Sequence, residues 1–350
     1  MAKKRTTLPK DFGEMLVKSS IDELKAVFDR CEVDARGGYT EQVALAFDLC
    51  PEELARWLRD KGADLSAEDR YGDTPLHAHA GSYRGNLAML LALGAIVDHG
   101  SGTRKGTALH RAATAAHPDN VRFLLSHEAE IDSVDGQGKT PLYRALQHAS
   151  NASLERVAEV ARLLVEAGAR VTPAFAEQVE RIGADFEFYR DGFNPESVDL
   201  TSAALDSLYT LFDVPPVPRR TVHNGTSRIV VSKGSWQAGF EELWNLLIPS
   251  AGAARTVQGE VVRIAGKIRH ELEGNGGVNW DHQFRQMADA WMEHVGSGEP
   301  LTASEAAEAT KLMAEIKSRS GDTDRMCELA VRWVSRNPDP VELTPPRYER

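Results

Sequence analysis

Few residues of this chain have the type and spacing that chemistry needs. Eleven histidines are present, but His270-Glu271 lacks the second histidine, four residues after the first, that a zinc-protease helix requires. Asp281-His282 could join Glu271 only through the tertiary fold. We therefore expect no metal and no cofactor. Residues 275–282 are where an enzymatic or small-ligand site would lie under the rival interpretation.

Motifs for nucleotide binding and nucleophilic catalysis are also absent. No Gly-x-x-x-x-Gly-Lys-Ser/Thr loop or Gly-x-Ser-x-Gly elbow occurs, and the glycine-rich segment 274–277 follows a predicted helix rather than a strand. Three cysteines, Cys31, Cys50 and Cys327, lie far apart in the chain. Such thiols are usually buried and free in a reducing compartment. We predict no catalytic residue and a cytoplasmic, non-enzymatic protein.

The charge is acidic and unevenly distributed. The chain has 41 basic and 52 acidic side chains, a net charge of −11. Residues 1–172 carry 22 basic and 25 acidic groups, and residues 173–350 carry 19 and 27. Nucleic-acid binding depends on lysine and arginine neutralising phosphates, so it is disfavoured. No apolar run is long enough to cross a membrane. The acidity either maintains solubility or attracts a basic partner.

The elements that would position any site are set by an internal repeat. Three short motifs begin 33 residues apart: Thr-Pro-Leu-His at Thr74, Thr-Ala-Leu-His at Thr107 and Thr-Pro-Leu-Tyr at Thr140. A Leu-Leu pair follows in each unit, and an alanine at Ala95, Ala129 or Ala169 closes it. Threonine can cap a helix, and proline fits its first turn. A period of this length is typical of stacked helical repeats.

This combination of motifs resembles the ankyrin-repeat family. The resemblance implies an all-α solenoid of helix-turn-helix repeats joined by short hairpin loops. A degenerate first repeat begins near Thr40, with Glu41-Gln42-Val43 in place of Pro-Leu-His. We expect an ankyrin domain over 1–172, with an N-terminal helical cap over 10–38 and repeats starting near 40, 74, 107 and 140.

Two departures from the family pattern stand out. The interval from the motif threonine to the closing alanine is 21, 22 and 29 residues in the three clear repeats. The extra residues of the last repeat, around 148–156, predict a surface loop that either shapes a binding face or reflects drift. His79 occupies a position where the family usually has a buried alanine, so its imidazole needs space and a partner.

The second half of the chain is predicted to be a separate helical region. Apolar residues at helical spacing predict a capping helix pair over 173–213 and a helical bundle over 221–338. The proline-rich segment 214–226 is interpreted as a stiff linker, residues 228–231 as a short strand, and residues 339–350 as a frayed tail. The stripes assign Trp236, Trp244, Trp280 and Trp291 to the core. The region from Trp236 to Trp291 resembles a tail found on some bacterial ankyrin proteins.

Ankyrin proteins usually bind partners along their hairpin tips and first helices, which form the concave face. On this chain the resemblance places 13 residues there, although the same positions must be solvent-exposed in any case. Most of the charged ones are basic, which favours an acidic or mixed partner. The residues are Arg70, Tyr71, Asp73, Ser82, Arg104, Lys105, Arg111, Thr114, Gln137, Lys139, Arg144, Gln147 and His148.

The sequence thus favours a bacterial, cytoplasmic protein that binds another protein through the concave face of ankyrin repeats. An immunity or inhibitor protein against a toxin and a general scaffold fit this pattern equally well. The rival from another class is an enzyme or small-ligand-binding protein with its site near 275–282.

Overall fold

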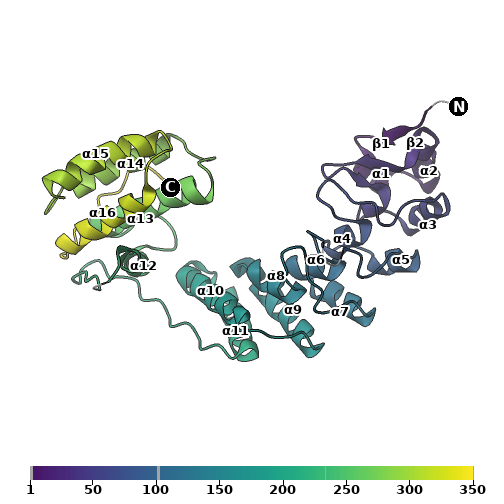
Figure 1. Ribbon diagram of the computed structural model, residues 1–350, viewed down its shortest axis with the longest axis horizontal. Coiled ribbons are helices and arrows are strands. Elements are labelled where there is room, and N and C mark those ends of the chain that lie inside the picture. Colours follow the sequence, from purple (N-terminus) through teal and green to yellow (C-terminus); the bar gives the residue numbers. More distant parts are fainter. Residues whose placement is uncertain (1–2, 101–102, 233, 350) are drawn as a thin grey trace. The chain divides into compact units, whose positions relative to one another are not determined.

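The computed structural model describes residues 3–100, 103–232 and 234–349. It divides the chain into two compact units (Figure 1). The N-terminal unit comprises residues 1–186 and 194–217, and the C-terminal unit comprises residues 187–193 and 218–350. Both are mainly helical, so the expected all-α fold class is confirmed.

The N-terminal unit begins with the predicted helix pair, α1 (Phe12–Lys18) and α2 (Ile21–Arg30). A strand was not expected, yet β2 (Cys31–Gly37) pairs in parallel with β1 (Arg5–Thr7) and antiparallel with β3 (Gln42–Val43). The backbone of Glu41 has φ +58 and turns the chain back onto β2. Because Gln42 and Val43 pair with β2, the first helix of the degenerate repeat shrinks to the single turn η1 (Ala44–Ala46) before α3 (Glu52–Asp60).

Three complete helix pairs follow: α4 (Pro75–Ala80) with α5 (Leu87–Ala92), α6 (Ala108–Thr114) with α7 (Pro118–Ser126), and α8 (Pro141–Gln147) with α9 (Leu154–Glu166). The first helices contact one another in the order α4, α6, α8, and α7 contacts α9. Figure 1 shows these pairs side by side. Leu76, Leu109 and Leu142 are at most 2% exposed, so the motif leucines fill the interfaces between repeats.

The expectation of a surface loop in the lengthened fourth repeat is wrong, because the added residues are mainly helical. Residues 151–153 form the 3₁₀ turn η2, and α9 begins at Leu154 and runs for 13 residues, against nine in α7. Leu154 and Val157 are buried. The added sequence therefore mainly lengthens the second helix and its apolar face. Helices α10 (Ala174–Tyr189) and α11 (Pro195–Phe212) come next, and α11 packs on α9.

The C-terminal unit holds five α-helices among its described residues: α12 (Trp236–Leu247), α13 (Val257–Arg269), α14 (His282–Val295), α15 (Ala303–Lys317) and α16 (Thr323–Arg336). Helix α13 is central because it contacts α12, α14 and α16, and Val261, Ile264 and Ile268 on it are fully buried. A π turn, η4 (His270–Gly274), extends α13. Of the four tryptophans assigned to the core, Trp291 is fully buried, while the other three pack against the core with part of the ring exposed.

The segments predicted to be a linker, a strand and a frayed tail pack onto the C-terminal unit instead. In the predicted linker, the Arg220 guanidinium donates to the carbonyl oxygens of Asn245 and Trp244, and His223 is buried. Residues 228–231 form no strand, because no strand lies beside them in the described part of the chain. The Ile229 N–H donates instead to the carbonyl oxygen of Pro338, which belongs to no strand.

The predicted frayed tail is likewise wrong. The Val341 N–H donates to the Gln258 side chain, Thr256 and Glu342 form an isolated antiparallel bridge, and Tyr348 is 6% exposed. Residues 338–348 thus form a strap over the C-terminal unit. The strap is held because its aromatic end has a buried acceptor, Glu260.

Candidate functional site

The motif threonines and histidines have a structural role in the repeats. Thr74 precedes α4, and its N–H lies 3.3 Å from His77 Nδ1, while His77 Nε2 lies 2.9 Å from the carbonyl oxygen of Gly106 in the next repeat. His110 repeats the arrangement, with Thr107 at 3.0 Å and Lys139 O at 3.0 Å. Each imidazole therefore caps its own helix and holds the following hairpin.

His79, the departure from the family pattern, also has its space and its partners. Its side chain is fully buried. Nδ1 accepts the N–H of Asn86 at 2.9 Å, and Nε2 lies 3.2 Å from the carbonyl oxygen of Phe47 in the preceding repeat. The link between α4 and α5, residues 81–86, brings Asn86 within reach of the imidazole. The imidazole therefore supplies an acceptor for the Asn86 N–H and a second hydrogen bond to the Phe47 carbonyl, which also accepts from the Cys50 N–H.

These buried imidazoles predict acid sensitivity. Burial lowers the pKa of His77, His79 and His110, although each gains a backbone acceptor. Above about pH 6.5 the folded and unfolded forms are both neutral. Below this pH the histidines are protonated in the unfolded chain but remain neutral in the folded chain. The free energy of unfolding therefore falls by up to about 1.4 kcal/mol per pH unit for each histidine until its folded pKa is reached.

The measurement is the urea midpoint of the N-terminal unit between pH 7.5 and 5. Brief N-ethylmaleimide labelling of the buried Cys31 and Cys50 thiols, normalised to unfolded chain at each pH, reports this unit separately. The midpoint should fall steadily below pH 6.5. A constant midpoint down to pH 5 would contradict the assignment.

Two of the hairpin turns that join the repeats share one construction. Asp69 Oδ1 accepts the N–H groups of Tyr71 and Asp73 at 2.8 and 2.9 Å. Asp135 Oδ1 does the same for Gln137 and Lys139 at 2.8 and 3.0 Å. Backbone hydrogen bonds join each of these turns to the preceding repeat, from Arg70 to Thr40 and from Gly136 to Thr103. These bonds fix the two tips along the edge of the solenoid.

Comparison with known families agrees with this geometry. A model of the family described as "Ankyrin repeats (3 copies)" matches residues 43–135 and 79–174. Residues 43–174 are ankyrin repeats. Ankyrin repeats generally mediate protein–protein interaction, and their stacked units present an extended binding surface.

Two relatives illustrate how far the similarity extends. The chain is 30% identical over 122 residues to neurogenic locus notch homolog protein 2 of Homo sapiens, which covers 34% of this chain and 5% of the relative. It is 31% identical over 121 residues to a putative ankyrin repeat protein of fowlpox virus, covering 34% of this chain and 35% of the relative. The chain thus spans about a third or less of the length of these relatives.

On the ankyrin repeats, one group of tip side chains forms an exposed cluster of aromatic and basic residues. We name it the tip cluster: Tyr39, Arg70, Tyr71 and Lys105. The Arg70 guanidinium lies 5.6 Å from the ring of Tyr39 and 5.3 Å from that of Tyr71, and Lys105 Nζ lies 5.9 Å from the latter. A hydrogen bond with Tyr39 raises the pKa of Tyr71. Tyr39 is 81% exposed and Tyr71 42%.

Exposed aromatic rings beside arginine are what protein interfaces use as anchors. Two carboxylates of the same edge are engaged within the chain. Asp69 closes its own turn, and Asp73 is buried, with its Oδ2 3.8 Å from Arg111 Nε. The tip cluster is consequently basic and aromatic in character.

The 13 residues expected at a partner surface therefore separate into two groups. Five are hydrogen-bonded within the chain or buried, although two of them, Gln137 and Gln147, remain exposed. Arg144 is 15% exposed and contacts buried Asp135, and its guanidinium also donates to Gln137 and Gln147. Ser82 donates to Asp48 at 2.7 Å. Asp73, the fifth, is buried, which corrects its expected exposure at the tip.

The remaining eight are at least partly accessible, and three of them, Arg70, Tyr71 and Lys105, belong to the tip cluster. Lys139 Nζ lies 3.9 Å from the Tyr143 ring, and the His148 imidazole lies 3.0 Å from the carbonyl oxygen of Arg144. The accessible set is Arg70, Tyr71, Arg104, Lys105, Arg111, Thr114, Lys139 and His148. Sequence reasoning missed Tyr39, although a tyrosine next to the degenerate threonine of the first repeat was the available signal.

At the alternative site near 275–282, the hydrogen bonds stabilise a turn. Glu271 is buried and accepts from the Asn279 N–H at 2.5 Å and from the Asn275 side chain at 3.0 Å. It thereby holds the turn after η4, in which Gly276 and Gly277 have positive φ. Within the described ranges, no group of three or more His, Cys, Asp or Glu side chains is placed to hold a metal. No helix in the part of the chain that the structure describes is long and apolar enough to cross a membrane.

Proposed function

We propose that this protein binds an acidic or mixed-charge protein partner through the tip cluster, with Arg104 and the accessible first-helix residues Arg111 and Thr114 extending the surface. The single observation that carries the proposal is the exposed contact of Arg70 with the rings of Tyr39 and Tyr71. These contacts restrict the arginine side chain before binding, so less side-chain freedom is lost on association.

The proposed role is that of a non-enzymatic binding protein of the bacterial cytoplasm. Three buried free thiols support a reducing compartment, and the resemblance of residues 236–291 to tails of bacterial ankyrin proteins supports the source. An immunity or inhibitor protein against a toxin and a scaffold are the two roles under this proposal. Affinity capture from native cells separates them: one stoichiometric partner encoded beside this gene indicates an inhibitor pair, and several partners indicate a scaffold.

The direct test compares the affinity of a variant that lacks two positive charges at the tips with that of a variant that lacks two positive charges elsewhere. With the captured partner, Arg70→Ala with Lys105→Ala should weaken binding at least about 30-fold, because anchor residues at interfaces contribute about 2 kcal/mol or more. Tyr39→Ala with Tyr71→Ala should do the same.

The matched control is Arg122→Ala with Arg162→Ala, which removes two positive charges from the outer helices α7 and α9. This control should leave affinity within about threefold of wild type. Equal losses in the tip variant and the control would indicate a nonspecific charge effect and refute the proposed surface.

A further inference from the structure

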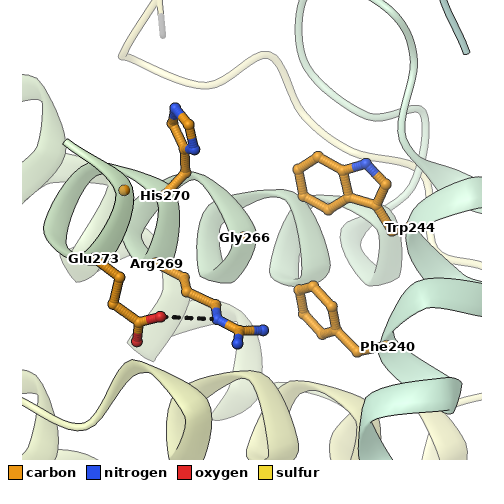
Figure 2. A pocket seen from close by; sticks show the side chains of 7 residues that line it. Phe240, Trp244, Gly266, Arg269, His270 and Glu273 are labelled. Atoms are coloured by element: carbon orange, nitrogen blue, oxygen red, sulfur yellow. Dashed lines mark hydrogen bonds and ion pairs between the residues drawn. The ribbon is translucent and has the colours of Figure 1, made fainter. Parts of the chain in front are cut away.

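A hollow of about 430 Å³ lies on the C-terminal unit, between α12 and the end of α13. Its volume falls within the range of small-molecule sites, and it is widely open to solvent. Figure 2 shows the rings of Phe240 and Trp244 on one side and the side chains of Arg269 and Glu273 on the other, along the same helix. The hollow is separate from the ankyrin repeats and from the turn at 275–282.

The aromatic rings that line the hollow are held by contacts with one another and with the backbone of α13. The Trp244 indole lies nearly parallel to Phe188, at 6.3 Å between ring centroids and 14° between planes, and to Phe240, at 6.2 Å and 27°. Gly266 lies beneath the indole, where an added Cβ would be 2.1 Å from Trp244 Cζ3. Only glycine lets the ring rest on the helix backbone, so a larger residue here would displace the wall.

The polar side offers one oriented hydrogen-bond donor. Arg269 Nε lies 3.2 Å from Glu273 Oε2, and Nη2 lies 2.8 Å from Asp324 Oδ1. Its Nη1 group donates to no other described residue, and Figure 2 shows the guanidinium directed toward Phe240. Because two carboxylates already neutralise Arg269, the donor suits an uncharged acceptor better than an anion. The neighbouring η4 segment is a π turn, a geometry that frequently occurs at functional sites.

We propose that this hollow binds a small, flat aromatic molecule that carries an uncharged carbonyl group. The rings of Phe240 and Trp244 contact the flat ring system, and Arg269 Nη1 donates to the carbonyl oxygen. His270 lies at the rim and is exposed, so its imidazole can form a second hydrogen bond, with a polar substituent of the ligand. This activity is independent of the proposed binding of a protein partner.

Isothermal titration of the full chain with indole-3-carboxamide tests the proposal. Three comparators each lack one feature: indole has no acceptor, cyclohexanecarboxamide has no aromatic ring, and indole-3-carboxylate is charged. Indole-3-carboxamide should bind at least about fivefold more tightly than each, the value of one hydrogen bond or one stacking contact. No heat at millimolar ligand, or equal binding of cyclohexanecarboxamide, would overturn the proposal.

Two variants locate the binding. Arg269→Met should weaken indole-3-carboxamide about fivefold and leave indole unchanged, and Gly266→Ala should weaken both by more than tenfold. Arg285→Met and Gly234→Ala make the same substitutions at exposed positions outside the hollow and should bind like wild type. If Gly266→Ala strongly lowers the melting temperature, its binding result is set aside and Arg269→Met decides the test. Undiminished binding of indole-3-carboxamide by Arg269→Met would then refute the site. Tighter binding of N-acetyl-L-tryptophanamide than of indole-3-carboxamide would assign the hollow to a partner's side chain and overturn the small-molecule proposal.

Discussion

Replacement of Glu260 by glutamine should destabilise the C-terminal unit by about 3–5 kcal/mol, the usual penalty for removing one partner of a buried ion pair. Glu260 is fully buried and Arg263 is 1% exposed. One carboxylate oxygen accepts from Arg263 Nη2 at 2.6 Å and from the Tyr348 hydroxyl at 2.7 Å. The other accepts from Arg263 Nε at 2.8 Å and from the Ala254 N–H at 3.0 Å.

The charge on Glu260 is what glutamine removes. Burial alone would raise the pKa of this carboxyl, but the Arg263 guanidinium and the hydrogen bonds lower it overall. The carboxylate is therefore ionised at neutral pH. Glutamine keeps the shape but directs N–H groups at donors, and it leaves a buried guanidinium without this counter-charge.

Urea unfolding followed by tryptophan fluorescence measures the effect, since five of the six tryptophans follow residue 230. Glu241→Gln, at an exposed position of α12, is the matched control and should change stability by less than about 0.5 kcal/mol. Similar midpoints for the two variants would show that the pair contributes little. The strap should also loosen in Glu260→Gln, seen as faster amide exchange over residues 338–348.

Replacement of His79 by alanine should destabilise the ankyrin repeats by about 2–4 kcal/mol, although alanine is the family's usual residue there. The change leaves the Asn86 N–H without its acceptor, at about 1–3 kcal/mol when unrelieved, and opens a cavity where the imidazole was buried. It also removes one of two hydrogen bonds to the Phe47 carbonyl, which keeps the Cys50 N–H as a donor. Local relaxation offsets part of this. Residues 81–86 after α4 are arranged around the imidazole, so the family's usual alanine no longer fits.

His79→Gln is the informative companion, because its amide can accept from Asn86 and donate to Phe47. It should recover at least half of the loss. His127→Ala, at an exposed position after α7, is the control for removing a histidine. Labelling of Cys50 in urea provides the measurement, and an alanine variant as stable as wild type would show that the Asn86 N–H finds another acceptor and that the imidazole adds no stability.

The local parts of the fold were predictable because their signals lie within a few residues of one another. Thr74, Thr107 and Thr140 each precede a helix of the expected pair, and His77 and His110 make the inter-repeat bonds that the motif implies. The helices of the second half follow their apolar stripes, and Gly276 and Gly277 take positive φ after the π turn.

The failures share a physical origin in pairing between distant segments. Strand β2 forms because β1 and β3 lie beside it, and a lone seven-residue segment carries little signal of that pairing. Residues 228–231 have strand-like composition but no adjacent strand. The tail is ordered by Glu260, which lies 88 residues before Tyr348 in the chain.

By itself, the sequence determined that residues 43–174 stack as ankyrin repeats, because each repeat's caps, leucines and closing turns are encoded locally. Only the tertiary structure decided which side chains are accessible for binding. It joined Tyr39 to Arg70 and Tyr71, turned Asp73 and Arg144 inward, and placed Trp244 over Gly266. Contacts of this kind depend on how separately encoded elements pack, since burial and pairing are properties of the assembled surface rather than of any one segment.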